Sequence, residues 1–329
     1  MSARRVIVRE EEWPIEGTFT IARNSKTSAE VTVVEIHQDG QRGRGECVPY
    51  LRYGETREGT AAQIEKVREE LESGALGRPE IQRLLEPGAA RNALDCAFWD
   101  LEAKLFGIPV WRLAGLKEPT SVTTAFTVSL ADPEAMAEIA KENQHRPLLK
   151  LKLGGKDDIR RVRAVREAAP GATLIVDANE AWTPLTFSNF GDELSELGVK
   201  LVEQPVPAGT DSFLEGLGRT VPVCADESIH DTAGLAEVAR RYDFINIKLD
   251  KAGGLTEALR LANASQSAGI GIMLGCMVGT SLGMAPASLL ASVAQFVDLD
   301  GPLLLAEDRD PGIRYVESTM HPPPPELWG

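Results

Sequence analysis

The sequence predicts an α/β protein: a modified TIM-type β/α barrel joined to an α+β capping domain. Beyond about residue 120, eight short apolar runs alternate with amphipathic helical stretches, the pattern of parallel strands joined by helices. Before that point the chain contains a β-hairpin followed by helices, which is typical of a separate α+β unit. We therefore expect capping-domain residues over 1–119, the barrel over 120–302, and a C-terminal segment over 303–329 that returns to the capping domain.

Length and composition limit the class of protein further. With 329 residues, 43% of them hydrophobic, the chain can bury a core large enough for one large domain and a smaller one. The net charge of −14 argues against a nucleic acid or an anionic membrane surface as a partner. The four cysteines contain no CxxC pair, and no run is apolar enough for a signal segment or a membrane span. We expect a cytoplasmic protein, and its oligomeric state stays open, a homo-oligomer included.

Two stretches predict the capping domain. Residues 29–49 form a strand, a turn at Asp39-Gly40 and a second strand, so they indicate a hairpin. Residues 89–107 carry apolar side chains at helical spacing, and Gly107 is expected to end that helix.

Eight apolar runs predict the barrel strands. An open doubly wound sheet is the rival topology, but no GxGxxG fingerprint follows an early strand. Residues 282–294 indicate a core helix, and the Pro-rich tail is expected to lie against the capping domain. The eight runs are 121–128, 148–154, 172–179, 199–205, 221–228, 244–250, 269–276 and 296–302.

Ionisable residues close most of these runs. From Lys152 to Lys248 they are separated by 25, 26, 23 and 22 residues, each about one β/α unit. The spacing places them at the carboxyl ends of successive strands, where β/α barrels have their active sites. The residues are Lys152, Asp177, Glu203, Asp226, Lys248, Asp298 and Asp300.

Three of these residues are carboxylates expected on adjacent strands. Asp177, Glu203 and Asp226 would repel one another unless a cation lay between them, and oxygen ligands suit Mg²⁺. For any one of them alone, an acid that caps the next helix is the better interpretation. Three in register beside strand-borne lysines favour a metal site.

The lysines predict acid/base chemistry. In "LLKLKLG" (148–154), Lys150 and Lys152 point to the same face of a strand, where burial of two ammonium groups is unfavourable. Together with Lys248 they would place amines on two walls of one site. Burial, a neighbouring ammonium and a metal ion would each lower a lysine pKa toward the range of a base. Alternatively, Lys150 and Lys152 lie on the solvated face of an edge strand. The alternative for Lys248 is that its aliphatic stem is buried while its ammonium group reaches solvent.

Five motifs on five consecutive predicted strands resemble one family. "KLK", "DAN", "EQP", "ADES" and "NIKLDKAGG" occur in the order and spacing of the muconate-lactonizing subgroup of the enolase superfamily. "GECVPYLRYGE" (45–55) and "AARNALDCAFWDLEAKLFGIPV" (89–110) resemble its capping domain, so the resemblance covers nearly the whole chain. "IARNSKTSAE" (21–30), "GCMVGTSLG" (275–283) and "DLDGP" (298–302) resemble the dipeptide epimerases, most closely the L-Ala-D/L-Glu epimerases.

The resemblance implies roles for the residues at the strand ends. The three carboxylates match Mg²⁺ ligands, Lys152 and Lys248 match the two acid/base lysines, and Lys150 matches the lysine that tunes its partner. Asp298 and Asp300 match the pair that binds the α-ammonium group of a dipeptide. The implied activity is a Mg²⁺-dependent 1,1-proton transfer at the C-terminal residue of a dipeptide, in recycling of cell-wall peptide. Two opposed lysines suit such an inversion, because one removes the proton and the other donates to the far face.

The cap loops carry further candidate residues. Arg23 matches the arginine that meets a glutamate side chain, although a solvated surface arginine fits the sequence equally well. Arg52 and Tyr53 either close over the substrate or stay exposed. Asn179 and Glu227 are expected to contact the metal ligands.

Several alternative functions stay open. o-Succinylbenzoate synthase and muconate cycloisomerase resemble the chain too, but their substrates offer no ammonium group to Asp298 and Asp300. N-succinylamino acid racemase is disfavoured because the amine of its substrate is acylated. Epimerisation of other dipeptides is a further alternative, since Arg23 is the only residue that favours glutamate as the C-terminal residue of the substrate. A metal-stabilised barrel that binds a dipeptide without turnover is the alternative from another class, although pure binding needs no pair of bases.

Overall fold

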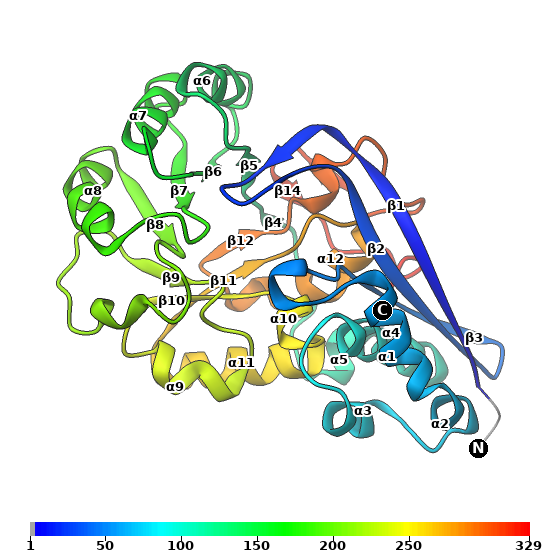
Figure 1. Cartoon of the computed structure of the whole chain (residues 1–329). Helices are drawn as coiled ribbons and strands as arrows, with labels where there is room; N and C mark the ends of the chain where they lie inside the picture. Colours follow the sequence, from blue (N-terminus) through cyan, green and yellow to red (C-terminus); the bar gives the residue numbers. More distant parts are fainter. Residues whose placement is uncertain (1–3) are drawn as a thin grey trace.

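The structure is a computed structural model that describes residues 4–329. It contains a three-stranded antiparallel sheet with helices packed on it, and an eight-stranded parallel sheet surrounded by helices (Figure 1). The first sheet and its helices form a cap beside the barrel.

The cap sheet has the order β1-β2-β3, with β1 (Arg5–Thr20), β2 (Ser25–Gln38) and β3 (Gln41–Cys47). The predicted hairpin is β2-β3, whose turn residues Asp39 and Gly40 both have left-handed backbone conformations. The strand β1 was not predicted. It pairs with β2, so their connecting loop extends over the mouth of the barrel (Figure 1).

The helix α4 is the centre of the cap. Strand β3 lies directly on it, because a Cβ atom on Gly43 would fall 2.1 Å from the carbonyl oxygen of Ala97. The helix ends at Gly107, which is left-handed as predicted. The helical segments of the cap are η1 (Leu51–Tyr53), α1 (Arg57–Lys66), α2 (Arg68–Ser73), α3 (Arg78–Leu84), α4 (Ala89–Phe106) and α5 (Val110–Leu113).

The eight-stranded sheet confirms the predicted barrel. Neighbouring strands pair in parallel in chain order, and a 2.8 Å hydrogen bond from the Ala125 amide to the Val297 carbonyl links the two outermost strands. The strands are β5 (Phe126–Val128), β6 (Leu148–Lys152), β7 (Thr173–Asp177), β8 (Val199–Glu203), β9 (Val223–Ala225), β10 (Phe244–Ile247), β11 (Gly271–Gly275) and β12 (Phe296–Asp298).

The first predicted run was wrong in one respect. Only its second half belongs to the barrel, because β4 (Val122–Thr123) pairs instead with β14 (Thr319–Met320), which also pairs with β13 (Tyr315–Val316). The C-terminal residues contact the cap, where the Gly329 amide donates to Asp100 and the Trp328 indole donates to the Cys96 carbonyl.

Helices connect most of the strands. The predicted core helix is α12, which ends at Ser288, before the rest of the predicted range. No helix in residues 4–329 combines the length and apolarity needed to cross a membrane. The helices are α6 (Pro133–Glu142), α7 (Asp158–Ala168), α8 (Pro184–Glu196), α9 (Leu235–Val238), α10 (Leu249–Ala252), α11 (Leu255–Ala268) and α12 (Ser281–Ser288). The 3₁₀ segments are η2 (Asp211–Leu214), η3 (Thr232–Gly234), η4 (Ala291–Val293) and η5 (Gly301–Leu304).

The barrel interior has an apolar floor. Side chains two apart on a strand share a face, so four of the six floor residues lie beneath an ionisable residue two positions later. Leu148 precedes Lys150 in this way, and Ile175 precedes Asp177. The floor residues are Ala125, Leu148, Ile175, Leu201, Cys224 and Met273, with Phe244 and Phe296 packed against them.

Candidate active site

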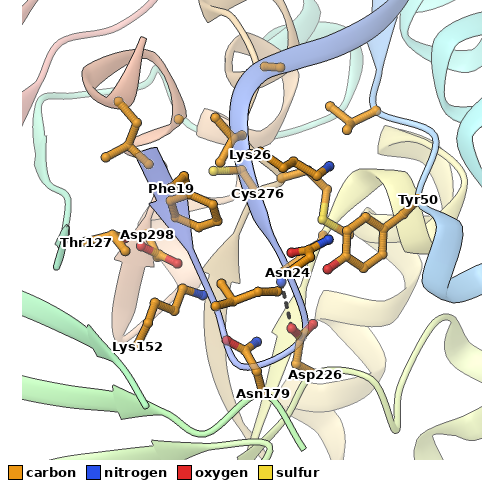
Figure 2. Close-up of a pocket in the computed structure, with 18 of the residues that line it drawn as sticks. Phe19, Asn24, Lys26, Tyr50, Thr127, Lys152, Asn179, Asp226, Cys276 and Asp298 are labelled. Atoms are coloured by element: carbon orange, nitrogen blue, oxygen red, sulfur yellow. Dashed lines mark hydrogen bonds and ion pairs between the residues drawn. The ribbon is translucent and has the colours of Figure 1, made fainter. Parts of the chain in front are cut away.

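A pocket lies between the carboxyl ends of the barrel strands and the loops of the cap. Lys152 on β6 lines it (Figure 2), and so does Lys248, directly after β10. So do most of the residues predicted for the site: Arg23, Tyr53, Lys152, Asn179, Asp226, Glu227, Lys248, Asp298 and Asp300. Lys150, Asp177 and Glu203 are buried outside this lining, and Arg52 lies on the cap surface beside it.

The two lysines of the pocket each contact a carboxylate. Lys152 Nζ donates to Asp177 Oδ2 at 2.7 Å, and Lys248 Nζ donates to Asp226 Oδ2 at 2.7 Å. Their side chains are only 9% and 8% exposed. The structure therefore brings two buried amines from strands four apart in the barrel into one cavity.

Lys150 explains how two lysines on one strand face can be buried. Its Nζ lies 2.7 Å from Asp298 Oδ2, 2.6 Å from Glu203 Oε2 and 3.4 Å from Asp177 Oδ2. Carboxylates on three other strands thus surround an ammonium group whose side chain is 1% exposed. This ion-pair network offsets the desolvation and repulsion that an isolated pair of lysines would suffer.

Contacts with carboxylates set the direction of the pKa shift of two lysines. Burial would lower the pKa of Lys248, but Asp226 and Glu203 outweigh it and raise that pKa well above its ordinary value. The pKa of Lys150 is raised in the same way, against burial, by Asp298 and Glu203. The sequence shows neighbouring lysines but does not show which carboxylates contact them, and these contacts set the direction of both pKa values.

The strand register places the three predicted metal ligands side by side. Asp177 on β7 is opposite Glu203 on β8, and Asp226 follows β9, the next strand. Burial would raise the pKa of Asp177, but Lys152 and Lys150 outweigh it and lower that pKa to about 2. Burial, followed by the charge of Asp177, raises the pKa of Glu203.

The chemistry of this layer suits a divalent cation. Within residues 4–329, no three His, Cys, Asp or Glu side chains are grouped so that they could hold a metal ion, and each of the three predicted ligands contacts a lysine. Six carboxylates are nevertheless buried there against four lysines, and Arg23 pairs with one of the six, Glu227, which leaves an excess of one negative charge. Buried unneutralised charge is costly, and oxygen ligands suit Mg²⁺. The ten residues are Lys150, Lys152, Asp177, Glu203, Asp226, Glu227, Lys248, Lys251, Asp298 and Asp300.

Two residues that hold the predicted metal ligands were missed. Lys251 Nζ donates to Asp226 Oδ1 at 2.5 Å, and Asn246 Nδ2 donates to Glu203 Oε1 at 2.7 Å. The signal was present in "NIKLDKAGG": Asn246 is two residues before Lys248 on the same strand face, and Lys251 follows Lys248 by about one helical turn.

Asp298 and Asp300 both line the pocket, but in different environments. Asp298 Oδ2 accepts from Lys150, whereas its Oδ1 is buried without a hydrogen-bond partner in the described structure. Asp300 Oδ2 accepts from the Thr127 amide at 2.7 Å. Burial, followed by the charge of Asp298, raises the pKa of Asp300 to about 7.

The cap contributes ion pairs at the pocket mouth. Arg23 Nη1 donates to Glu180 Oε2 at 2.8 Å and Nη2 donates to Glu227 Oε1 at 2.6 Å. Arg52 makes two 2.9 Å bonds to Glu180, a residue that the sequence did not single out. Glu227 thus contacts Arg23, although it was predicted to contact the metal ligands.

Asn179 and Tyr53 are the remaining predicted residues. The Asn179 backbone N–H donates to Asp177 Oδ1 at 2.9 Å, so Asn179 contacts a residue predicted to bind the metal ion. The Tyr53 ring lies edge-on to the His230 ring, with centroids 4.6 Å apart. Tyr53 therefore links the cap loop to the segment that follows β9.

Family comparisons agree with this geometry. Residues 3–115 match the family described as mandelate racemase / muconate lactonizing enzyme, N-terminal domain. Residues 134–323 match the enolase C-terminal domain-like family. The chain therefore belongs to the mandelate racemase/muconate lactonizing enzyme family of the enolase superfamily, as the sequence motifs indicated.

Individual relatives are similar over nearly their whole length. The chain is 45% identical over 320 residues to an L-Ala-D/L-Glu epimerase of Escherichia coli (strain K12), covering 97% of this chain and 99% of that one. It is 46% identical over 298 residues to an N-acetyl-D-glutamate racemase of Pseudoalteromonas sp, covering 90% and 94%.

Solved structures are similar in fold throughout. An enolase family member from Agrobacterium tumefaciens, described as homologous to dipeptide epimerases with bound sodium and L-Ala-L-Glu, has a TM-score of 0.97 at 50% identity, covering 99% and 100%. A dipeptide epimerase from Enterococcus faecalis V583, complexed with Mg and L-Leu-L-Tyr, has a TM-score of 0.89 at 32% identity, covering 98% and 97%.

Proposed function

We propose that this protein is a Mg²⁺-dependent dipeptide epimerase that inverts the α-carbon of the C-terminal residue, with L-Ala-D/L-Glu as the preferred substrate. One observation carries the proposal: Lys152 and Lys248 reach the same pocket from β6 and from the end of β10. Inversion needs a base on one face of the carbon and an acid on the other, and two amines on different walls supply both. The epimerase relatives named above support the same reaction.

Asp177, Glu203 and Asp226 are the residues that would hold Mg²⁺. A Mg²⁺ ion there would take up negative charge on the substrate carboxylate and weaken the hold of these carboxylates on the lysine ammonium groups. Lys152 removes the α-proton of one epimer while the Lys248 ammonium donates to the far face, and the roles reverse for the other epimer. Lys150, two residues before Lys152 on the same strand face, keeps a positive charge there and fixes Asp298 by its 2.7 Å hydrogen bond.

The amine end of the dipeptide lies near Asp298 and Asp300 in this proposal. The free Asp298 Oδ1 and the Asp300 carboxylate are the acceptors available to an ammonium group there. The cap loops would cover the side chain of the C-terminal residue. A cytoplasmic location and a role in cell-wall peptide recycling belong to the same proposal and rest on the family resemblance.

Racemisation of N-acylated glutamate is the second candidate. The 46% identity to an N-acetyl-D-glutamate racemase favours it, and the Lys150–Asp298 ion pair reduces the negative charge available to an ammonium group. The argument from Asp298 and Asp300 against a substrate with an acylated amine is therefore weaker than it was from the sequence alone.

Proton NMR in D₂O tests the proposal. The purified protein with Mg²⁺ and L-Ala-L-Glu should lose the glutamate α-proton signal while L-Ala-D-Glu accumulates. If only N-acetyl-L-glutamate exchanges its α-proton, the protein is a racemase of N-acylated glutamate, which is the second candidate function. Binding of L-Ala-L-Glu without exchange of any substrate would identify a binding protein. Lys248→Ala is the matched control, which should lose epimerisation but retain dipeptide binding.

A further inference from the structure

The cap helix α4 directs buried polar side chains toward the segment that follows Lys248 in the chain. Arg91, Asn92 and Asp95 of this helix are all buried. The segment consists of the short helix α10 and the start of α11, and both helices lie beside the cap helices (Figure 1). Because buried polar groups need hydrogen-bond partners, the contacts of these three residues show how the cap fixes the segment.

Arg91 binds the C-terminal end of α10. Its Nη2 group donates to the Ala252 carbonyl at 2.7 Å, and its Nε group donates to the Gly253 carbonyl at 3.1 Å. Lys248 is the residue at which α10 begins, so the helix is only one turn long. One buried guanidinium group therefore fixes the far end of the turn that starts at Lys248.

Asp95 binds the start of α11. The Thr256 amide donates to Asp95 Oδ2 at 2.8 Å, and the Thr256 hydroxyl donates to Asp95 Oδ1 at 2.6 Å. The Trp99 indole donates to the same hydroxyl at 3.0 Å. A carboxylate in this position satisfies an amide of the first helical turn that has no partner within the helix. The cap helix thus holds the end of α10 and the beginning of α11 together.

The two glycines of "KAGG" allow this close approach. A Cβ atom on Gly253 would fall 2.4 Å from Arg91 Nε, and one on Gly254 would fall 2.5 Å from Asp95 Oδ2. Both glycines also have positive φ angles, which residues with a side chain adopt at a cost. The glycines in the barrel motif and the polar residues in the cap motif therefore form one contact.

This contact reaches one of the two proposed acid/base lysines and not the other. Asn92 Nδ2 donates at 2.9 Å to Asp250 Oδ1, only two residues after Lys248. Among residues 4–329, no α4 side chain hydrogen-bonds to β6, the strand of Lys152. We infer that Arg91 and Asp95 are positioning residues for Lys248. The inference rests on the proposed function, in which Lys248 transfers a proton on one face of the α-carbon.

A positioning role predicts a loss on one face only. Displacing a reacting group by about 1 Å can lower a rate by about 100-fold. If Lys248 is displaced, Lys152 can still remove and return a proton on its own face. Weakening the contact with α4 should therefore reproduce the defect of Lys248→Ala in a milder form, whereas general damage to the fold would impair both faces equally.

The test is α-proton exchange in D₂O, measured by NMR with L-Ala-L-Glu and L-Ala-D-Glu separately. Asp95→Asn and Arg91→Lys should each lower epimerisation by about 10- to 100-fold and the exchange of one epimer by the same factor. Exchange of the other epimer, the one that Lys248→Ala retains, should change by less than about threefold. Saturating Mg²⁺ is used because Lys251, in the same segment, contacts Asp226.

Asp100→Asn is the matched control. Asp100 is a buried carboxylate of the same helix, but it accepts from the Arg44 and Gly329 amides, away from Lys248. This variant should lower the thermal unfolding temperature while leaving the exchange of both epimers within about threefold of the wild type. If neither Asp95→Asn nor Arg91→Lys folds, Thr256→Val, which removes one hydroxyl group, should show the same preference between epimers at a several-fold level.

Three results would overturn the inference while the wild-type protein still exchanges both epimers. They are equal losses for both epimers in the folded variants, wild-type exchange of both, and retention of the epimer that Lys152→Ala retains. Wild-type protein that exchanges neither epimer would instead overturn the proposed function, and the inference with it.

Discussion

The barrel side and the cap side of the pocket are both built from ion pairs, but the pairs differ in burial. Lys150 and Lys248 are 1% and 8% exposed, whereas Arg23 and Arg52 are 26% and 39% exposed. Removing one member of a buried ion pair is strongly destabilising, because its partner is left as an uncompensated buried charge. A solvent-exposed ion pair contributes little to the free energy of unfolding. The barrel side is therefore suited to fixed acid/base groups, and the cap side to contacts that break when substrate enters.

Removing a carboxylate from the barrel side should have the largest effect. Asp226→Asn takes the ionic partner from both Lys248 and Lys251, which are buried. We expect turnover to fall by about 10³-fold or more and Mg²⁺ affinity to be lost, with the protein destabilised by about 3–5 kcal/mol. Calorimetric Mg²⁺ titration and thermal unfolding measure these effects. Asp192→Asn, an exposed residue of α8, is the control, and equal behaviour of the two variants would refute the distinction.

A residue that only positions a metal ligand should have a smaller effect. Lys251→Met removes the donor to Asp226 Oδ1 but leaves Lys248 in place. Mg²⁺ affinity should fall by about 10- to 100-fold, which is typical for groups that orient metal ligands. Saturating Mg²⁺ should restore much of the turnover. An unchanged Mg²⁺ affinity would show that Lys251 does not position Asp226.

Asp300 is expected to lower the stability of the folded protein while contributing to dipeptide binding. Its folded-state pKa of about 7 lies above the ordinary aspartate value of 3.8, so the folded state binds the proton more tightly than the unfolded state. Because the ionised Asp300 carboxylate is unfavourable in the folded state, the free energy of unfolding should fall as pH rises from about 4 to 7. Asp300→Asn should therefore be stabilising by about 1–3 kcal/mol at pH 8 and by much less at pH 4, while weakening dipeptide binding. A stability difference that is independent of pH would contradict this account.

The smallest effect is expected on the cap side. Glu180→Gln breaks the ionic contacts that fasten Arg23 and Arg52 to the barrel rim. Because those arginines are partly exposed, unfolding free energy should change by less than about 1 kcal/mol. KM should rise by several-fold with kcat nearly unchanged, since the loops position substrate without touching the α-carbon. A drop in kcat as large as the one expected for Asp226→Asn would contradict the difference between the two sides.

The barrel was predictable because its signal repeats along the chain. Polar residues at the ends of apolar runs recur once per β/α unit, so Asp177, Glu203 and Asp226 could be placed on adjacent strands from the sequence alone. Strand β1 was missed because "REEEWPIEG" interrupts apolar alternation, and a partly exposed strand gives little hydrophobic signal.

The choice of ionic partners was not predictable. Lys150 contacts Asp298, 148 residues away, and Arg23 contacts Glu180 and Glu227 across the pocket mouth. Such pairs depend on how the barrel closes and where the cap lies, and neither leaves a local pattern in the sequence. The raised pKa values of Lys150 and Lys248 depend on the same contacts, since a pKa follows from the charged groups nearby.

The central claim is that Lys152 and Lys248 act on opposite faces of one carbon. The most direct test is α-proton exchange in D₂O by Lys152→Ala and Lys248→Ala, each with L-Ala-L-Glu and L-Ala-D-Glu separately. Both variants should lose epimerisation, but each should still exchange one epimer, and the retained epimer should differ between them. Retention of the same epimer by both variants, or epimerisation by either, would contradict the account.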